Sequence, residues 1–194
     1  DAEASDAGIV TAFNSDGFSL GDEGDVNGNT STFVSWGWKA NGTGSSNTDG
    51  TINTAATSAN TTSGFSIVSY TGNASSSQTV GHGLGAVPEM IISKNRDNSS
   101  SNYNDLVVYH HSLASANDKK MKLNTTDASS TTNEWGDTDP TSTVYSVHSS
   151  GDGATNDGTD KIVSYVWTGI KGFSKFGTYT GNGNADGAFA YLGF

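Results

Sequence analysis

The sequence predicts an all-β fold made of β-sandwich or jelly-roll-like units in a tandem repeat, with almost no helix. Gly, Ser, Thr and Asn make up 95 of the 194 residues, and these residue types supply the turns between strands. Aromatic residues account for 10% of the chain, and they fall inside short segments that alternate between two faces. This alternation is typical of strands with one buried face.

The expected strands are short, and each is bounded by Gly, Asn, Asp or Ser. They are Phe33–Trp38, Phe65–Tyr70, Glu89–Lys94, Leu106–His110, Met121–Asn124, Val144–His148, Ile162–Trp167, Phe176–Thr180 and Phe189–Leu192. The patterned strand faces place Trp36, Trp38 and Trp167 in the core. The sole helix candidate, Ser112–Lys120, is short and poorly periodic.

Charge and length exclude several classes of partner. The net charge is −11 and Arg96 is the one arginine, whereas nucleic-acid binding needs a basic patch. No segment approaches the roughly 18 apolar residues of a membrane span. We therefore expect no nucleic-acid partner and no membrane insertion. The chain has no cysteine, so no disulfide stabilises it.

An internal repeat organises the chain. Gly64-Phe65-Ser66 and Tyr70-Thr71-Gly72-Asn73 recur as Gly172-Phe173-Ser174 and Tyr179-Thr180-Gly181-Asn182. Phe33–Trp38 aligns with Ile162–Trp167, Asn27 with Asn156, and Phe18-Ser19-Leu20 with Tyr145-Ser146-Val147. Such spacing predicts units of roughly 110–130 residues. We expect the C-terminal part of one unit at 1–40, a Ser/Thr/Gly/Asn-rich connector at 41–63, a nearly complete unit at 64–171, and the beginning of a following unit at 172–194.

Six segments of the chain share a recognisable pattern, at residues 16–20, 33–40, 60–68, 80–85, 88–96 and 173–183. They resemble a tandem β-rich domain of virion structural and tail-fibre-like proteins of marine bacteriophages. The resemblance implies a structural protein exposed outside the virion, as a tail fibre, an appendage or a capsid decoration that contacts the host surface. It also implies a homo-oligomer that assembles with other virion proteins. A bacterial extracellular adhesin or filament subunit, and a carbohydrate-binding module, are the alternatives.

Two motifs of common enzymes are missing from the sequence. It contains no HExxH pair and no P-loop. Its paired carboxylates, such as Asp137 and Asp139, lie in turn-like stretches that are typical of solvated loops. We therefore predict a protein that is not an enzyme and needs no cofactor.

Two kinds of ligand site remain open. Oxygen ligands at short spacing suit Ca²⁺, and the candidates are Asp152, Asn156, Asp157 and Asp160, with Asp22, Asp25 and Asn27 at the equivalent positions. Asx turns that close a hairpin are the competing interpretation, which we favour. Aromatic side chains in polar segments are candidates for stacking against a host glycan, and these are Trp135 and Tyr103.

The beginning of the following unit supplies candidates for assembly, because an incomplete unit leaves a sheet edge open to strand addition. They are Phe176, Tyr179, Phe189, Tyr191 and Phe194. One hypothesis is that the incomplete units at 1–40 and 172–194 complete each other between subunits. The alternative is that the chain is a segment of a longer array.

Overall fold

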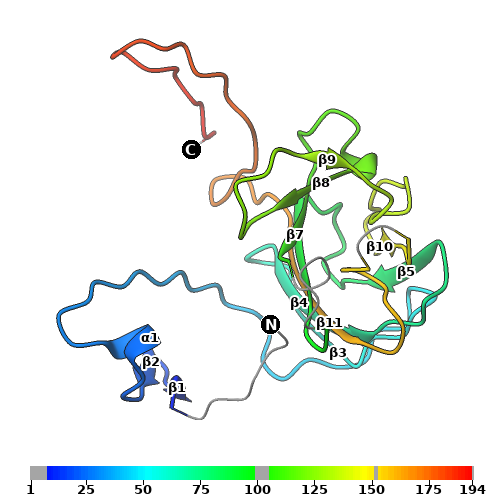
Figure 1. Ribbon diagram of the computed structural model, residues 1–194, viewed down its shortest axis with the longest axis horizontal. Coiled ribbons are helices and arrows are strands. Elements are labelled where there is room, and N and C mark those ends of the chain that lie inside the picture. The colour runs from blue at the N-terminus through cyan, green and yellow to red at the C-terminus, as the bar shows by residue number, and fades with distance from the viewer. Residues whose placement is uncertain (1–7, 99–104, 151–152, 194) are drawn as a thin grey trace. The chain divides into compact units, whose positions relative to one another are not determined.

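Strands dominate the structure, a computed structural model that describes residues 8–98, 105–150 and 153–193 (Figure 1). The described residues form two compact units, 8–38 and 39–193. Helix is confined to α1 (Gly24–Asn27) and the short 3-10 helix η1 (Ala116–Asp118). The predicted all-β fold is therefore confirmed. No helix in the described part of the chain is long and apolar enough to cross a membrane.

A seven-stranded antiparallel sheet forms the base of the larger unit, in the order β3-β4-β11-β6-β7-β8-β9. Its strands are β3 (Ala56–Asn60), β4 (Phe65–Thr71), β6 (Met90–Asn95), β7 (Val107–His110), β8 (Lys119–Lys122), β9 (Ser130–Thr131) and β11 (Lys161–Trp167). The sequence predicted β4, β6, β7, β8 and β11, together with β10 (Val144–Val147), to within about two residues.

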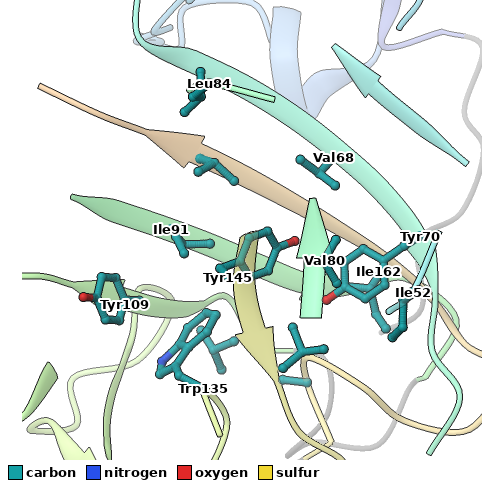
Figure 2. Close-up of a cluster of buried hydrophobic side chains, with 14 of the residues drawn as sticks. Ile52, Val68, Tyr70, Val80, Leu84, Ile91, Tyr109, Trp135, Tyr145 and Ile162 are labelled. Atoms are coloured by element: carbon teal, nitrogen blue, oxygen red, sulfur yellow. The ribbon is translucent and has the colours of Figure 1, made fainter. Parts of the chain in front are cut away.

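The core lies against one face of this sheet. A second sheet, in which β5 (Gln78–Gly81) pairs with β10 (Val144–Val147), contributes Val80, Tyr145 and Val147 to it. Opposite them, Val68, Ile91 and Ile162 project from the large sheet (Figure 2). The arrangement is sandwich-like, since side chains of two sheets enclose one apolar core.

The inward face of the large sheet also carries polar residues. Ser66 of β4, Ser93 of β6 and Ser164 of β11 are fully buried. The Oγ atoms of Ser93 and Ser164 lie 2.7 Å apart and share a hydrogen bond, which offsets the cost of burying hydroxyls. These small side chains leave room for the buried rings of Tyr70 and Tyr145. A core of this kind explains how a chain with only 32% hydrophobic residues forms an ordered sandwich.

Two pairings connect the first half of the larger unit with its second half. In the ladder of β4 and β11, Phe65 lies opposite Trp167 and Tyr70 lies opposite Ile162. In the ladder of β5 and β10, Val80 lies opposite Tyr145. The unit is therefore closed by strands that are distant in sequence.

The residues expected to form a connector, 41–63, belong to the larger unit. They contribute β3, which pairs with β4 from Ala56 to Asn60. They also contribute Ile52, which is buried in the core. Their polar composition suggested a linker, but Thr54, Thr57 and Ser58 are buried as well. Tertiary pairing thus overrides the composition of this segment.

The smaller unit contains a hairpin of β1 (Val10–Phe13) and β2 (Phe18–Leu20), followed by α1. The strand expected at Phe33–Trp38 is not formed. Trp36 is 74% exposed and Trp38 is 53% exposed, so the expectation that both lie in the core is wrong, whereas Trp167 is buried. A strand needs a partner for its backbone groups, and no strand ladder in the described part of the chain includes residues 33–38.

The strands expected at Phe176–Thr180 and Phe189–Leu192 are also absent, and residues 172–193 contain no strand. Of the helix expected at Ser112–Lys120, only η1 is formed. Lys119 and Lys120 instead begin β8, which pairs with β7 and β9.

Candidate functional site

A cleft of about 630 Å³ lies beside β6 and β7. Glu89, Tyr109, His111 and Asp139 supply its polar lining. Burial, reinforced by the charge of Asp139, raises the pKa of Tyr109 to about 12. Tyr109 is therefore protonated at neutral pH and acts as a hydrogen-bonding group rather than a base.

The polar groups of this cleft do not have the geometry of a catalytic triad. His111 Nε2 lies 3.9 Å from Glu89 Oε2 and 3.1 Å from Ser112 Oγ. In a triad the carboxylate orients one ring nitrogen while the other nitrogen takes the serine proton. Here both groups approach the same nitrogen. Glu89 therefore cannot orient the ring while His111 activates Ser112 in this arrangement.

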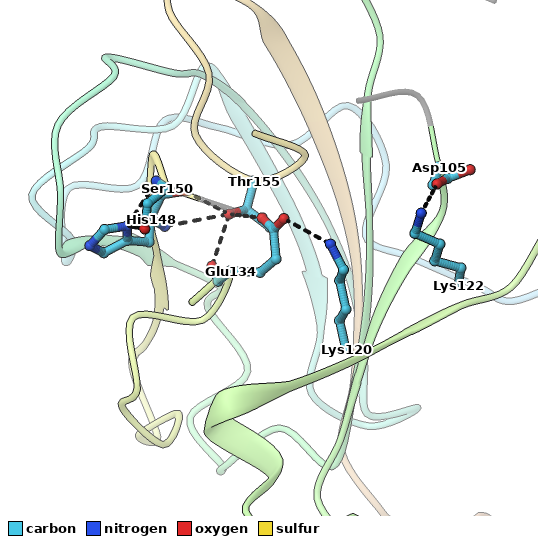
Figure 3. Close-up of polar contacts among 7 residues, drawn as sticks. All are labelled: Asp105, Lys120, Lys122, Glu134, His148, Ser150 and Thr155. Atoms are coloured by element: carbon cyan, nitrogen blue, oxygen red, sulfur yellow. Dashed lines mark hydrogen bonds and ion pairs between the residues drawn. The ribbon is translucent and has the colours of Figure 1, made fainter. Parts of the chain in front are cut away.

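A buried ion pair joins β8 to the segment before Trp135 (Figure 3). Lys120 Nζ lies 3.4 Å from Glu134 Oε1, and their side chains are 5% and 0% exposed. The Thr155 hydroxyl lies 3.2 Å from Glu134 Oε2 and 2.9 Å from the Glu134 backbone oxygen. Because both charges are desolvated, the pair holds only with such additional hydrogen bonds. It fixes three segments together rather than presenting a charge to a ligand.

A second ion pair lies further along β8. Lys122 Nζ is 2.7 Å from Asp105 Oδ2, and Asn124 Nδ2 donates to Asp105 Oδ1 at 2.8 Å. Burial by itself would raise the pKa of Asp105, but the hydrogen bonds from Lys122 and Asn124 outweigh it and the pKa is lowered. Asp105 therefore stays ionised to lower pH than a free aspartate.

Three of the four histidines stabilise turns. Nδ1 of His82, His110 and His148 accepts the backbone N–H two residues later, from Leu84, Ser112 and Ser150. An imidazole whose Nδ1 accepts a hydrogen bond carries its proton on Nε2, and His82 Nε2 accordingly donates to the Thr141 carbonyl at 3.2 Å. Burial lowers the pKa of His82. No sequence signal separates this role from catalysis or metal binding.

Trp135, one of the two glycan candidates, lies in the core. Its side chain is 1% exposed, and it packs edge-on against Tyr109 with 5.9 Å between ring centroids. The expectation of an exposed Trp135 ready to stack on a sugar is therefore wrong. Its polar neighbours in sequence suggested a loop, but the loop folds over the sheet. The other candidate, Tyr103, lies outside the described residues.

The calcium candidates are engaged by protein amides. Asn156 Oδ1 accepts the backbone N–H of Asn73 at 2.8 Å. Asp157 accepts a hydrogen bond from Asn98, and Asp160 accepts one from Asn95. Asp152 lies outside the described residues, and the described part of the chain holds no group of three or more His, Cys, Asp or Glu suited to a metal ion. These bonds join residues 59 to 83 positions apart, so they connect distant segments rather than closing local Asx turns.

An apolar groove of about 500 Å³ lies within the smaller unit. We call it the N-terminal groove. Its apolar lining comes from β1, β2, α1 and residues 33–36, namely Val10, Phe13, Phe18, Leu20, Val26, Phe33, Val34 and Trp36. Of these, Phe13, Val34 and Trp36 are the most exposed, at 87%, 72% and 74%. Side chains of this size are normally buried.

The comparisons with known proteins give one result. A domain of unknown function, DUF7483, matches residues 1–194. The chain belongs to the DUF7483 family. No curated protein matches it, and no solved structure matches it.

The other exposed apolar region of this DUF7483 chain is residues 172–193, which we call the C-terminal segment. Tyr179, Phe189 and Tyr191 are 75%, 88% and 69% exposed, and Phe176 is half-buried. Lys175 Nζ lies 5.2 Å from the centroid of the Tyr191 ring and donates to the Tyr191 carbonyl. Four of the five assembly candidates are thus placed, and Phe194 lies outside the described residues.

Proposed function

We propose that this chain is a noncatalytic structural protein of a bacteriophage virion, displayed outside the particle as a fibre, appendage or capsid decoration that contacts the host surface. One observation carries the structural part of the proposal. Of the 15 large hydrophobic residues that are exposed in the described structure, 13 belong to residues 8–38 and 172–193. Exposed apolar surface of this extent is typical of protein–protein contact.

The rest of the larger unit is self-sufficient by comparison. All the buried hydrophobic residues in the described structure lie between Ile52 and Trp167. A single-chain binding module would have little use for two further aromatic segments outside this core. A subunit of a larger assembly needs such surfaces, since the partner covers them. The virion assignment rests on the resemblance of residues 16–20, 33–40, 60–68, 80–85, 88–96 and 173–183 to phage structural proteins.

Immunogold labelling tests the virion assignment. An antibody raised against the chain is applied to purified intact particles of a phage that encodes it, and separately to cells of its host. We expect gold on the outside of the particles. Label on the surface of uninfected cells would favour an extracellular adhesin or filament, and particles without label would overturn the proposal. Particles of a phage that lacks the gene are treated with the same antibody as the control, and they should carry no gold.

A further inference from the structure

The smaller unit matches the second half of the larger unit. Phe18-Ser19-Leu20 in β2 aligns with Tyr145-Ser146-Val147 in β10, 127 positions later. The turn before each strand contains the same backbone hydrogen bond at this offset. The Asn14 N–H donates to the Gly17 carbonyl at 2.8 Å, and the Thr141 N–H donates to the Val144 carbonyl at 2.8 Å. After α1, Phe33–Trp38 aligns with Ile162–Trp167 of β11.

The C-terminal segment matches the first half of the larger unit. Phe173 aligns with Phe65, the first residue of β4, and Gly172 aligns with Gly64, the residue before it. Both glycines have left-handed backbones, with φ of 79° and 67°, a conformation that other residues seldom adopt. Residues 179–182 align with residues 70–73, at the end of β4 and the turn that follows it.

The two segments therefore correspond to halves that pair in the larger unit, where β4 binds β11 and β5 binds β10. In that unit the aligned side chains are buried, with Phe65, Tyr70 and Trp167 at 3%, 1% and 5% exposure. In the two segments, Phe173, Tyr179 and Trp38 are 63%, 75% and 53% exposed. What covers each of them in the larger unit is the other half.

We propose that the N-terminal groove binds the C-terminal segment of a second copy of this chain, so that the two halves build one further sandwich between copies. The inference rests on the proposed structural function and names the contact through which copies assemble. By the register of β4 and β11, Trp38 of one copy lies opposite Phe173 of the next. The segment from Phe173 to Tyr179 is one residue longer than that from Phe65 to Tyr70, so a one-residue bulge in it places Tyr179 opposite Phe33. Such a contact is head-to-tail and produces open filaments or closed rings.

A pair of asparagines gives the contact its specificity. In the larger unit, Asn156 Oδ1 accepts the N–H of Asn73 at 2.8 Å, and Asn156 Nδ2 donates to Asn73 Oδ1 at 3.2 Å. Asn27 aligns with Asn156, and Asn182 aligns with Asn73. The proposal thus pairs Asn27 of one copy with Asn182 of the next.

A glycine next to this pair provides a sharp test. A Cβ placed on Gly72 would lie 2.6 Å from the Asp157 carbonyl oxygen, because two backbones meet there. Gly181 aligns with Gly72, yet in the single chain a Cβ on Gly181 meets nothing within 4 Å. A side chain at position 181 is therefore harmless to one copy and blocks the proposed contact between copies.

The first experiment compares two glycine variants of the full 194-residue chain by sedimentation velocity over a concentration series. We expect the unaltered chain to form larger species as its concentration rises, and Gly181→Val to raise the concentration needed at least tenfold. Gly187→Val is the matched control, because Gly187 also has open space around it and aligns with Gln78, which carries a side chain. This control is expected to assemble as the unaltered chain does.

The second experiment mixes two blocked variants. Trp38→Asp removes the side chain that the proposal places opposite Phe173 and leaves the C-terminal segment intact. Gly181→Val blocks the C-terminal segment and leaves Trp38 and the groove intact. Each variant alone is expected to be a monomer, and an equimolar mixture is expected to give a heterodimer and nothing larger. This result is specific to a head-to-tail contact. Circular dichroism of both variants checks that the sandwich of residues 39–171 still folds.

The outcomes separate this inference from the proposed function. Assembly that is equally strong in Gly181→Val, or blocked variants that fail to combine, would overturn the pairing while leaving a structural role through other surfaces. A chain that remains a monomer at all concentrations, with its N-terminal groove protected from hydrogen exchange, would show that the halves pair within one copy and would also overturn it. Unlabelled virions bear on the proposed function alone.

Discussion

Trp135 packs edge-on against Tyr109, with 5.9 Å between the ring centroids and 73° between the ring planes. The contact joins the loop before β10 to β7 and closes one end of the core. The polar neighbours of Trp135 in the sequence suggest an exposed side chain, but Trp135 is part of the core of the sandwich.

Trp135→Ala is expected to destabilise the larger unit by about 3–5 kcal/mol, the usual cost of removing a fully buried aromatic side chain. Urea unfolding monitored by circular dichroism measures the change. Trp36→Ala is the control, since Trp36 is 74% exposed, and at dilutions where the chain is monomeric it should change the free energy of unfolding by less than about 0.5 kcal/mol. Similar losses in both variants would contradict the placement of Trp135.

Lys120→Met is expected to cost about 3–5 kcal/mol, because it leaves the fully buried Glu134 carboxylate without its cationic partner. The double variant Lys120→Met/Glu134→Leu removes both charges and should recover a large part of this loss. Chemical denaturation of the two variants gives the comparison. Lys119→Met on the same strand is a control with a partly exposed ammonium, for which a change of at most about 1 kcal/mol is expected. A double variant less stable than Lys120→Met would contradict the buried pair.

The stability of the fold should fall as the pH drops through about 6.5. Burial lowers the pKa of His82 in the folded state, so below 6.5 the unfolded chain binds a proton that the folded chain does not. The loss continues until the pH reaches the folded-state pKa. His82→Asn keeps an acceptor for the Leu84 N–H but does not titrate. Urea midpoints at pH 7.5, 6.5 and 5.5 should therefore fall less in His82→Asn than in the unaltered chain, and equal slopes would argue against this origin.

Asp105 should control part of the acid unfolding. Its folded-state pKa is lowered, so its contribution to stability is complete above about pH 4, the pKa of an unfolded aspartate. The contribution is lost as the pH falls through the folded-state value. Asp105→Asn should be less stable at pH 7 and lose less on going to pH 2 than the unaltered chain, as measured by thermal unfolding. A larger acid loss in the variant would refute this assignment.

Gly72→Ala should destabilise the larger unit by about 1–3 kcal/mol, because the new methyl group would lie 2.6 Å from the Asp157 carbonyl oxygen and force the two backbones apart. Thermal unfolding of the purified variant measures the effect. Gly187→Ala is the control, since the space around Gly187 is open. An unchanged midpoint in Gly72→Ala would mean that the close approach is not rigid, and it would weaken the equivalent argument for Gly181.

The alternating segments of the sequence were enough to place most strands of the larger unit. β4, β6 and β11 are long, aromatic or β-branched, and bounded by turn residues, so local pattern and tertiary pairing agree in them. β3 and β5 were not predicted, because the residues of Ala56–Asn60 and Gln78–Gly81 are mainly small and polar. Their strand conformation comes from the strands that they pair with: β3 pairs with β4, the next strand along the chain, and β5 pairs with β10, which is distant in sequence.

The candidate sites were harder to predict than the strands. The prediction that Trp135 stacks on a glycan is wrong because its side chain is buried. The composition of a loop does not determine whether the loop packs against a sheet or extends away from it. The residue pattern that predicted a buried Trp167 also predicted that Trp36 and Trp38 are buried. Trp167 lies opposite Phe65 within its own chain, whereas Trp36 and Trp38 belong to no strand ladder of the described residues. Alternation shows that a face is suited to burial, but a partner is needed to bury it.

By itself the sequence determined the all-β class and the positions of β4, β6, β7, β8, β10 and β11. These follow from side-chain period and turn chemistry, which are local. Only the tertiary structure decided that Trp135 is buried, that serines line the inward sheet face, that residues 41–63 complete the sheet, and that aromatic side chains of residues 8–38 and 172–193 remain exposed. Burial depends on which distant segments meet, and that is a property of the folded chain.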